Sequence, residues 1–382
     1  MVSTSDEPRS TSDAGNPARP VRDEDAFDVE AVAAWLSANA TTLPDGWRRD
    51  DLLGTPDVRQ FRGGASNLTY LLRYSPPNRA PRDLILRRPP AGVKAASAHD
   101  MGREFRIQSA LAPAFPYVPT MVGFCQDESV IGSDFYVMEK LDGTIVRRDL
   151  PWDLSADDAS TLCRNAFEVL IALHSVDVDS LPELTTLGRG DGYVARQVAG
   201  WTHRFEKART DDTGDWSDTV AWLEARQPAD VGQRLIHNDF RLDNLVLAAD
   251  DPLRVVGVLD WEMATVGDPL MDLGGSMAYW IEAGDDDFFQ MFRRQPSSAP
   301  GMWTRAQIVE RYCDRMGYSV TPEQWRFYEV FGLFRLAVIA QQIWYRYFHK
   351  QTTNEAYAVF GPAVGYLETR CRQLLTADPS GS

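Results

Sequence analysis

Residues 237–244, with the sequence HNDFRLDN, place an Asp five positions before an Asn, directly after a short apolar run. This spacing is typical of loops that transfer phosphoryl groups: the Asp accepts the proton of the attacking hydroxyl, and the Asn oxygen holds a magnesium ion on the nucleotide phosphates. Residues 255–260 read as a buried strand that ends in a carboxylate, where a second metal ligand is needed. The pattern predicts Asp239 as the catalytic base and Asn244 and Asp260 as metal ligands.

The composition indicates a globular chain with an acidic surface. Its 382 residues suffice for two domains or one large two-lobed one, and 44% of them are hydrophobic. The formal net charge of −16 argues against a nucleic-acid surface, which requires clustered Lys and Arg. Neutral or cationic partners fit this charge better.

Cysteines and terminal segments favour a reducing, cytoplasmic setting. The four cysteines are widely spaced without a C-x-x-C pair, which argues against a zinc site. Residues 1–25 are rich in Ser, Asp, Pro and Arg and are predicted to form a disordered tail instead of a signal peptide. The apolar segment 327–344 contains Glu329 and Arg335, so we predict a buried helix there and no membrane span.

A strand, a glycine turn and a second strand are expected over residues 58–74. The turn contains Gly63, Gly64, Ser66 and Asn67. Paired glycines allow positive φ angles and let backbone N–H groups approach a ligand, so this turn would cover phosphates. An ordinary hairpin turn is the alternative.

A third strand over residues 83–87 carries the basic group expected to hold the α- and β-phosphates. Alternation puts Arg87 on the same face as Ile85, whereas Arg88 points to the opposite face before a Pro-Pro break, and Lys94 falls in a loop. A helical pattern that starts near residues 97–100 contains Glu104, which we expect to pair with Arg87.

The sequence pattern of residues 135–234 predicts a hinge and a helical insert. Residues 135–139 read as a strand that runs into a turn, and the backbone of Glu139 to Leu141 would read the adenine edge. Ser155 would cap a helix that runs through His174, whose histidine we expect to be structural. Residues 175–234, with three tryptophans, would form a helical lid.

Several motifs together resemble the aminoglycoside phosphotransferase and choline kinase branch of the kinase-like fold. They are HNDFRLDN, VLDWE and GDPLMDLG. The segments GGASNLTYLL, DLILRRPP, REFRIQSAL and FYVMEKLDG are similar to one subgroup, which is related to the kinase-like domains fused to acyl-CoA dehydrogenases. The resemblance extends over residues 27–372.

The resemblance implies an α+β, two-lobed protein-kinase-like fold. A small N-lobe of antiparallel sheet would occupy residues 26–138, a hinge residues 139–143, and a mostly helical C-lobe residues 144–375. It also implies ATP and Mg²⁺ as cofactors, with Asp239 as the base, Asn244 and Asp260 as metal ligands, and Glu262 as a further metal or supporting group. His237 would brace the loop, and Asp272 would accept hydrogen bonds from its backbone.

These observations predict an ATP-dependent kinase that phosphorylates a hydroxyl of a small molecule. The chain lacks the G-x-G-x-x-G, H-R-D, D-F-G and A-P-E motifs, which argues against a peptide substrate. An acidic run would attract a polycationic aminoglycoside, although such runs are commonly solvated loops; its members are Glu282, Asp285, Asp286 and Asp287. A hydroxyacyl-type or other neutral metabolite is the alternative acceptor. A non-catalytic pseudokinase is the alternative class, because Arg87 stands where aminoglycoside kinases usually carry Lys.

Overall fold

The computed structural model describes residues 18–61, 67–90 and 100–376, and the chain divides into two compact units. The first unit contains the chain up to Leu154 together with Leu242–Met263. The second unit contains Ser155–Arg241 and everything from Ala264 onward. The turn with Gly63, Gly64 and Ser66, and also Lys94, lie outside the described residues.

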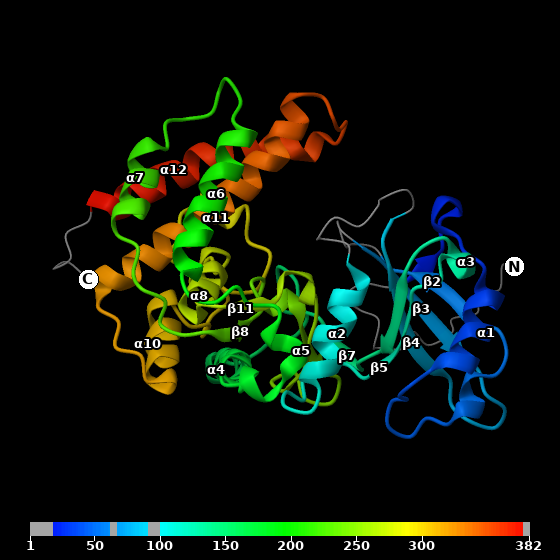
Figure 1. Ribbon diagram of the computed structural model, residues 1–382. Helices are drawn as coiled ribbons and strands as arrows, with labels where there is room; N and C mark the ends of the chain where they lie inside the picture. Colours follow the sequence, from blue (N-terminus) through cyan, green and yellow to red (C-terminus); the bar gives the residue numbers. More distant parts are fainter. Residues whose placement is uncertain (1–17, 62–66, 91–99, 377–382) are drawn as a thin grey trace, which may run out of the picture. The chain divides into compact units, whose positions relative to one another are not determined.

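The first unit is built on an antiparallel sheet with the strand order β1-β2-β3-β4-β6-β5 (Figure 1). The strands are β1 (Arg19–Pro20), β2 (Asp57–Gln60), β3 (Leu68–Tyr74), β4 (Arg82–Arg88), β5 (Met121–Cys125) and β6 (Phe135–Glu139). Its helices are α1 (Val29–Asn39), α2 (Met101–Leu111) and the short α3 (Glu128–Ile131). Asp28 and Asp100 cap α1 and α2, since each side chain accepts a hydrogen bond from the backbone in the first turn.

Both faces of this sheet are buried, and their side chains alternate along β4. Leu84 and Leu86 pack with Val32 and Leu36 of α1, whereas Ile85 packs with Met101 of α2. The predicted alternation is confirmed, because Arg87 continues the face of Ile85. Arg88 lies on the α1 face, where it donates to the backbone oxygen of Asp25 at 2.6 Å.

A second, three-stranded antiparallel sheet completes the first unit. It has the order β10-β9-β7, with strands β7 (Gly143–Thr144), β9 (Leu245–Ala248) and β10 (Val255–Val258). Hydrogen bonds such as Val258 N–H to the oxygen of Tyr117, at 2.7 Å, attach it to the rest of the unit. The segment 242–263 therefore belongs to the first unit, whereas a C-lobe over all of residues 144–375 was predicted.

The second unit is mostly helical. Its main helices are α4 (Ala156–His174), α6 (Tyr193–Ala208), α7 (Ser217–Ala225), α8 (Pro269–Ala278), α10 (Arg305–Met316), α11 (Pro322–Phe348) and α12 (Phe360–Thr376). Short helices α5 (Pro182–Thr185) and α9 (Asp287–Gln290) and an antiparallel pair, β8 (Arg234–Ile236) with β11 (Thr265–Gly267), connect them. Helices α6 and α7 form the predicted helical insert, and Trp216 before α7 is fully buried against Phe205 and Phe334.

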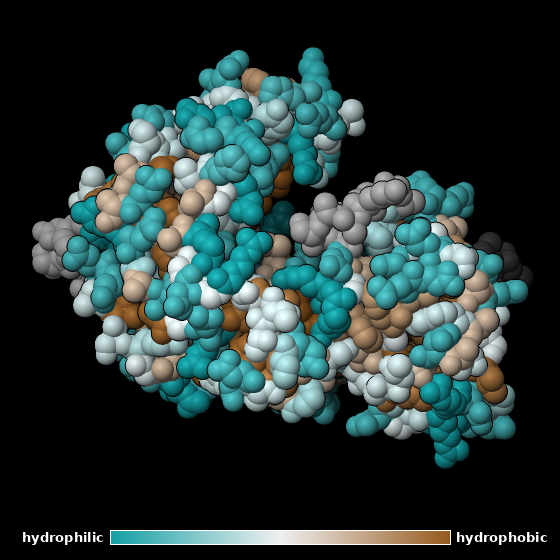
Figure 2. Space-filling view, viewed as in Figure 1, coloured by the Kyte–Doolittle hydropathy of each residue, from teal (hydrophilic) through white to brown (hydrophobic). Residues whose placement is uncertain are grey.

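Helix α11 covers the segment in which a buried helix was predicted. Within the described residues, no helix is both long and apolar enough to cross a membrane. On the face of the protein drawn in Figure 2, hydrophilic residues predominate, in keeping with the acidic composition.

Helices α8 and α11 approach each other through glycines. A Cβ atom on Gly274 would lie 2.6 Å from the backbone oxygen of Tyr328, and a Cβ atom on Gly332 would overlap the backbone oxygen of Gly274. Such distances leave no room for a side chain, so the two helix backbones are in direct contact.

We predict that Gly332→Ala destabilises the protein by about 1–3 kcal/mol, because the added methyl group must push the two helices apart. Gly365→Ala is the matched control: Gly365 is also in a helix interior, but nothing lies within 4 Å of the added Cβ atom. The control should be neutral or should stabilise by up to about 1 kcal/mol, since Ala favours helix over Gly. Urea unfolding measures both, and equal stabilities would contradict the contact.

Candidate active site

The first unit contains a buried ion pair between β4 and α2. The Nη1 atom of Arg87 lies 2.8 Å from a carboxylate oxygen of Glu104, and the Arg87 and Glu104 side chains are 11% and 2% exposed. The predicted pairing of these two residues is therefore present. Arg87 also lies 3.5 Å from the carboxylate of Asp260, so one guanidinium connects the sheet, the helix and the end of β10.

Two further polar groups hold Glu104. The hydroxyl of Tyr136 donates to Glu104 at 2.8 Å, and the amide of Asn67 donates to its other oxygen at 3.1 Å. Tyr136 stands directly opposite Arg87 in the β4–β6 register. Asn67 is fully buried and directly precedes β3. A buried carboxylate needs several such donors, because burial removes its hydration.

Burial and the neighbouring charges shift the pKa values of Arg87 and Glu104 in opposite directions. Burial raises the pKa of Glu104, while Arg87 and the Tyr136 hydroxyl oppose that rise. Burial alone would lower the pKa of Arg87, but the neighbouring Tyr136, Glu104 and Asp260 raise it above its ordinary value. Arg87 therefore stays positively charged, which a phosphate-binding group requires.

The predicted metal ligands Asn244 and Asp260 lie in one compact part of the first unit. The backbone N–H of Leu259 donates to the backbone oxygen of Asn244 at 2.8 Å, which joins the ends of their two segments. Asp260 adopts a left-handed backbone conformation with φ of 67°. Its Oδ1 atom is buried and accepts no hydrogen bond from any described residue, although Arg87 lies nearby. A buried oxygen in this state fits a cation ligand.

Glu262, the further metal candidate, is held from two sides. Its carboxylate lies 3.5 Å from the amide of Asn67, and its backbone oxygen accepts from Arg103 at 2.8 Å. Among the described residues, no cluster of three or more His, Cys, Asp or Glu side chains is placed to hold a metal. A site with one carboxylate and one amide oxygen suits Mg²⁺, which commonly completes its shell with phosphate oxygens and water.

The predicted hinge is partly occupied by contacts within the protein. The backbone N–H of Glu139 donates to the oxygen of Thr120 at 2.8 Å, and the Glu139 carboxylate accepts from the N–H of Thr120 at 3.1 Å. The side chain of Leu141 packs directly on Gly257, where a Cβ atom would overlap it. The N–H of Glu139 is thus not available to adenine in this arrangement.

In the second unit, the loop that carries Asp239 is anchored by Asp272 of α8. One carboxylate oxygen of Asp272 accepts from the backbone N–H of His237 at 2.8 Å, and the other accepts from that of Asn238 at 2.8 Å. The role expected for Asp272 is confirmed. His174, buried at the end of α4, lies 3.1 Å from Asp272 and 2.6 Å from the hydroxyl of Tyr312. His174 is therefore structural, as predicted.

Burial of Asp272 disfavours its charged form, but its hydrogen bond to His174 and the bonds from the loop outweigh burial. They hold the pKa of Asp272 below its usual range. The carboxylate is thus ionised at neutral pH and accepts from both backbone N–H groups.

Asp239 itself is partly exposed and ion-paired within its loop. Its carboxylate accepts from Arg241 at 3.0 Å, and its side chain is 22% exposed. The Arg241 guanidinium stacks 4.7 Å above the ring of Tyr279. The predicted base is accessible to a small molecule, whereas the His237 side chain is fully buried and braces the loop by accepting from the N–H of Asp239 at 3.2 Å.

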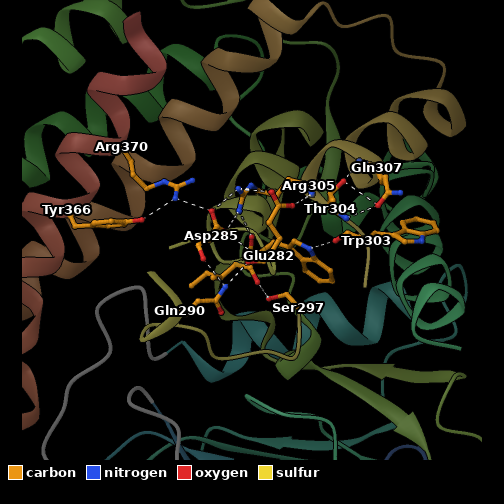
Figure 3. A network of polar contacts seen from close by, with 12 residues as sticks. Glu282, Asp285, Gln290, Ser297, Trp303, Thr304, Arg305, Gln307, Tyr366 and Arg370 are labelled. Carbon is orange, nitrogen blue, oxygen red and sulfur yellow. Dashed lines mark hydrogen bonds and ion pairs between the residues drawn. The ribbon is translucent and has the colours of Figure 1, made fainter. Parts of the chain in front are cut away.

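The acidic run of the second unit is used for internal structure (Figure 3). Glu282 pairs with Arg305 at 2.9 Å, and Asp285 pairs with Arg305 at 2.6 Å and with Arg370 at 3.0 Å. Asp286 caps α9 and accepts from the hydroxyl of Tyr366. Three of the four carboxylates are thus already matched by groups of the protein, which weakens the idea that this run recruits a polycation.

Sequence reasoning did not identify Tyr136 or Arg335 as site residues. Tyr136 faces Arg87 only because β6 pairs with β4, a register that a single sequence does not reveal. Arg335 donates to the backbone oxygen of Asn238 at 2.6 Å. The sequence indicates Arg335 only as the single cation of the apolar segment 327–344, because a buried Arg needs a hydrogen-bond or charge partner.

Residues 57–308 match the profile of the Phosphotransferase enzyme family. The chain belongs to this family. Mouse "Acyl-CoA dehydrogenase family member 10" is 34% identical over 329 residues, which cover 86% of this chain and 29% of the relative. The chain spans less than half the length of the curated relatives it matches.

Solved structures agree with the phosphotransferase family. A Ralstonia eutropha protein assigned as an aminoglycoside phosphotransferase superposes with a TM-score of 0.75 at 28% identity, covering 91% of this chain and 98% of that one. An aminoglycoside phosphotransferase in complex with AMP-PNP and hygromycin B gives a TM-score of 0.51 at 16% identity, over 86% and 96% of the two chains. The expected kinase-like fold, with an antiparallel N-terminal sheet and a mostly helical C-terminal part, is confirmed.

We predict that Arg87 and Glu104 are strongly coupled in stability. Glu104→Ala should cost about 3 kcal/mol, because it leaves a buried guanidinium without its main counter-charge. The double variant with Arg87→Ala should cost less than the sum of the single variants. Urea unfolding of all four proteins gives the coupling energy.

The exposed pair Arg254 and Asp250 in the same unit is the control, with side chains 51% and 80% exposed. Its coupling should be much smaller, because water screens exposed charges. Equal coupling in the two pairs would show that burial of Arg87 and Glu104 contributes nothing.

Proposed function

We propose that this protein transfers the γ-phosphoryl group of ATP to a hydroxyl group of a small molecule. The observation that carries the proposal is the buried, hydrogen-bond-free oxygen of Asp260 beside Arg87 and close in the chain to the Asp239–Asn244 motif. Membership of the phosphotransferase family and the likeness to a fold that binds an ATP analogue support it. We propose a cytoplasmic setting for this activity, from the cysteine usage.

In this mechanism Arg87 would bind the α- and β-phosphates, with Glu104 and Tyr136 fixing the orientation of its guanidinium. Asn244 and Asp260 would hold Mg²⁺, with Glu262 in support. When bound, this ion neutralises charge on the phosphates. The backbone of Lys140 and Leu141 would contact adenine, because the N–H of Glu139 already donates to Thr120. That the turn with Gly63, Gly64, Ser66 and Asn67 covers the phosphates stays a prediction, since the first three of these residues lie outside the described part of the chain.

The hydroxyl oxygen of the acceptor would attack the γ-phosphorus, and Asp239 would accept the proton of that hydroxyl. The bond between the γ-phosphorus and the bridging oxygen of the β-phosphate breaks, and ADP leaves. Positioning supplies most of the rate in such reactions. Asp272 contributes to it indirectly, because it fixes the two backbone N–H groups that precede Asp239.

A hydroxyacyl-type metabolite is the acceptor class that we favour over a polycationic aminoglycoside. The internal pairing of Glu282 and Asp285 removes the main argument for cation recruitment. Curated relatives are named acyl-CoA dehydrogenase family members 10 and 11, and these names support an acyl substrate. A pseudokinase is the second candidate, and Arg87 in place of the usual Lys is the observation in its favour.

The test is a screen of ADP release from Mg-ATP with kanamycin, hygromycin B, choline, a hydroxycarboxylate and a hydroxyacyl thioester as acceptors. We expect turnover with the thioester, and Asp239→Asn should lower it by about 10²–10⁴-fold while calorimetry shows unchanged Mg-ATP binding. Asp250→Asn, at an exposed turn, is the control and should be fully active. Binding without turnover on any acceptor would indicate a pseudokinase, and an active Asp239→Asn variant would remove Asp239 from the base role.

Asp260→Ala should instead weaken nucleotide binding in a magnesium-dependent way. The lost carboxylate leaves phosphate charge without neutralisation, so the affinity for Mg-ATP should fall while the weaker affinity for metal-free ATP changes little. Calorimetry with and without Mg²⁺ measures both affinities. If neither affinity nor its magnesium dependence changes, Asp260 serves only the structure.

A further inference from the structure

Arg335 is a buried cation with no carboxylate partner in the part of the chain that the structure describes. It lies in α11 between fully buried apolar residues, among them Phe334 and Ala337, and is 8% exposed. Buried arginines are normally paired with carboxylates, because burial removes their hydration. Among the described residues, no Asp or Glu lies within ion-pair distance of Arg335. Its contacts are the backbone oxygen of Asn238, at 2.6 Å, and the ring of Trp201, 5.4 Å from the guanidinium carbon.

Asn238, the residue that Arg335 contacts, has an unusual backbone conformation. Its φ is 64°, in the left-handed region that few residues other than Gly adopt. Asn tolerates this region better than most residues, but it still needs support from its surroundings. This conformation turns the chain directly before Asp239. The contacts that hold the backbone of Asn238 therefore also orient the Asp239 carboxylate.

Three elements of the second unit support Asn238 at three different groups. Asp272 of α8 accepts from its N–H, Arg335 of α11 donates to its backbone oxygen, and Tyr193 of α6 donates to its side-chain oxygen at 3.3 Å. Burial raises the pKa of Tyr193 to about 12, so its hydroxyl is protonated at neutral pH and can donate.

The contact with Arg335 acts on one peptide plane. The carbonyl of Asn238 and the N–H of Asp239 belong to the same planar unit. Arg335 binds the oxygen of this plane, and His237 Nδ1 accepts from its N–H at 3.2 Å. With both sides held, the plane cannot rotate without breaking a hydrogen bond to a charged group, which is stronger than a neutral one.

We propose that Arg335 is a positioning residue for phosphoryl transfer, which locks the peptide plane between Asn238 and Asp239 and so aims the Asp239 carboxylate at the acceptor hydroxyl. This inference rests on the proposed function of Asp239 as the base. A misplacement of about 1 Å in such a group can cost about 10²-fold in rate. Arg335 itself needs no contact with the acceptor.

Gly275 of α8 provides a second, independent way to disturb the contact. A Cβ atom on Gly275 would lie 2.7 Å from Nη1 of Arg335. Gly275→Ala would thus push the guanidinium away without removing its charge.

A matched control exists on the same helix. Gln341 of α11 is 1% exposed and donates from its side chain to a backbone oxygen, that of Ala208, at 2.8 Å. It resembles Arg335 in burial, element and type of acceptor, but its acceptor ends α6 and is not in the loop of Asp239. Gln341→Met should therefore lower stability and leave turnover unchanged.

The experiment compares Arg335→Met, Arg335→Lys, Gly275→Ala and Gln341→Met with the unaltered protein, all at a temperature at which each is folded. ADP release from Mg-ATP is measured with water alone and with the best acceptor of the panel above, and hydrogen exchange is followed for residues 235–241. For Arg335→Met we expect kcat to fall by about 10²-fold with the KM for Mg-ATP unchanged, together with faster exchange in the loop. Arg335→Lys, which keeps a charged donor, should recover part of kcat.

Unaltered kcat and exchange in Arg335→Met would overturn the proposal, and so would equal losses of kcat in Arg335→Met and Gln341→Met. If Arg335→Met does not fold, Gly275→Ala and Arg335→Lys decide: both should lower kcat at unchanged KM, and unchanged kcat in both would refute the role. The two proposals fail separately. An active Asp239→Asn variant removes the base role, whereas an inactive one beside a fully active Arg335→Met variant removes only the positioning role.

Discussion

The buried carboxylate of Asp272 is the constraint on which the loop of the second unit depends. It accepts from two consecutive backbone N–H groups and from His174, all within 3.1 Å. Those N–H groups belong to a turn with a left-handed residue, and no regular helix or strand could have satisfied them there. One charged side chain in an apolar helix thus replaces the hydrogen bonds that ordinary secondary structure would have provided. His174 is in turn held by the hydroxyl of Tyr312, which contacts its other ring nitrogen.

The first unit also contains a buried charged group, but there it is a guanidinium and not a carboxylate. Arg87 is buried at the end of β4, and Glu104 compensates it with the help of Tyr136 and Asn67. Because Asp260 lies near the same guanidinium, the group proposed to bind phosphate and a group proposed to bind metal share one electrostatic environment. A cation bound to Asp260 would neutralise this carboxylate and leave the positive charge of Arg87 without it as a counter-charge. A phosphate bound to Arg87 would balance that positive charge, so the two ligands would favour each other's binding.

Local patterns were enough to predict the elements and many of the candidate residues. Alternation along β4 separated Arg87 from Arg88, and the spacing between Asp239 and Asn244 predicted phosphoryl transfer, which stays a proposal. What could not be predicted depends on pairing between distant segments. Tyr136 reaches Glu104 through a strand register, and the carboxylates of the acidic run find Arg305 and Arg370 through helix packing. Sequence distance hides both, because neither has a local period.

The glycine contact between α8 and α11 determines more than the distance between two helices. Asp272 precedes Gly274 by two positions on α8, and Arg335 follows Gly332 by three on α11. Two of the residues that hold the loop of Asp239, Asp272 and Arg335, are therefore positioned by the same backbone contact. If the two helices slid past each other by about an ångström, Asp272, which accepts from the loop, and Arg335, which donates to it, would move in different directions. The reason is that Asp272 lies on α8 and Arg335 on α11. The position of the Asp239 carboxylate would then depend on Gly274 and Gly332, two residues without side chains.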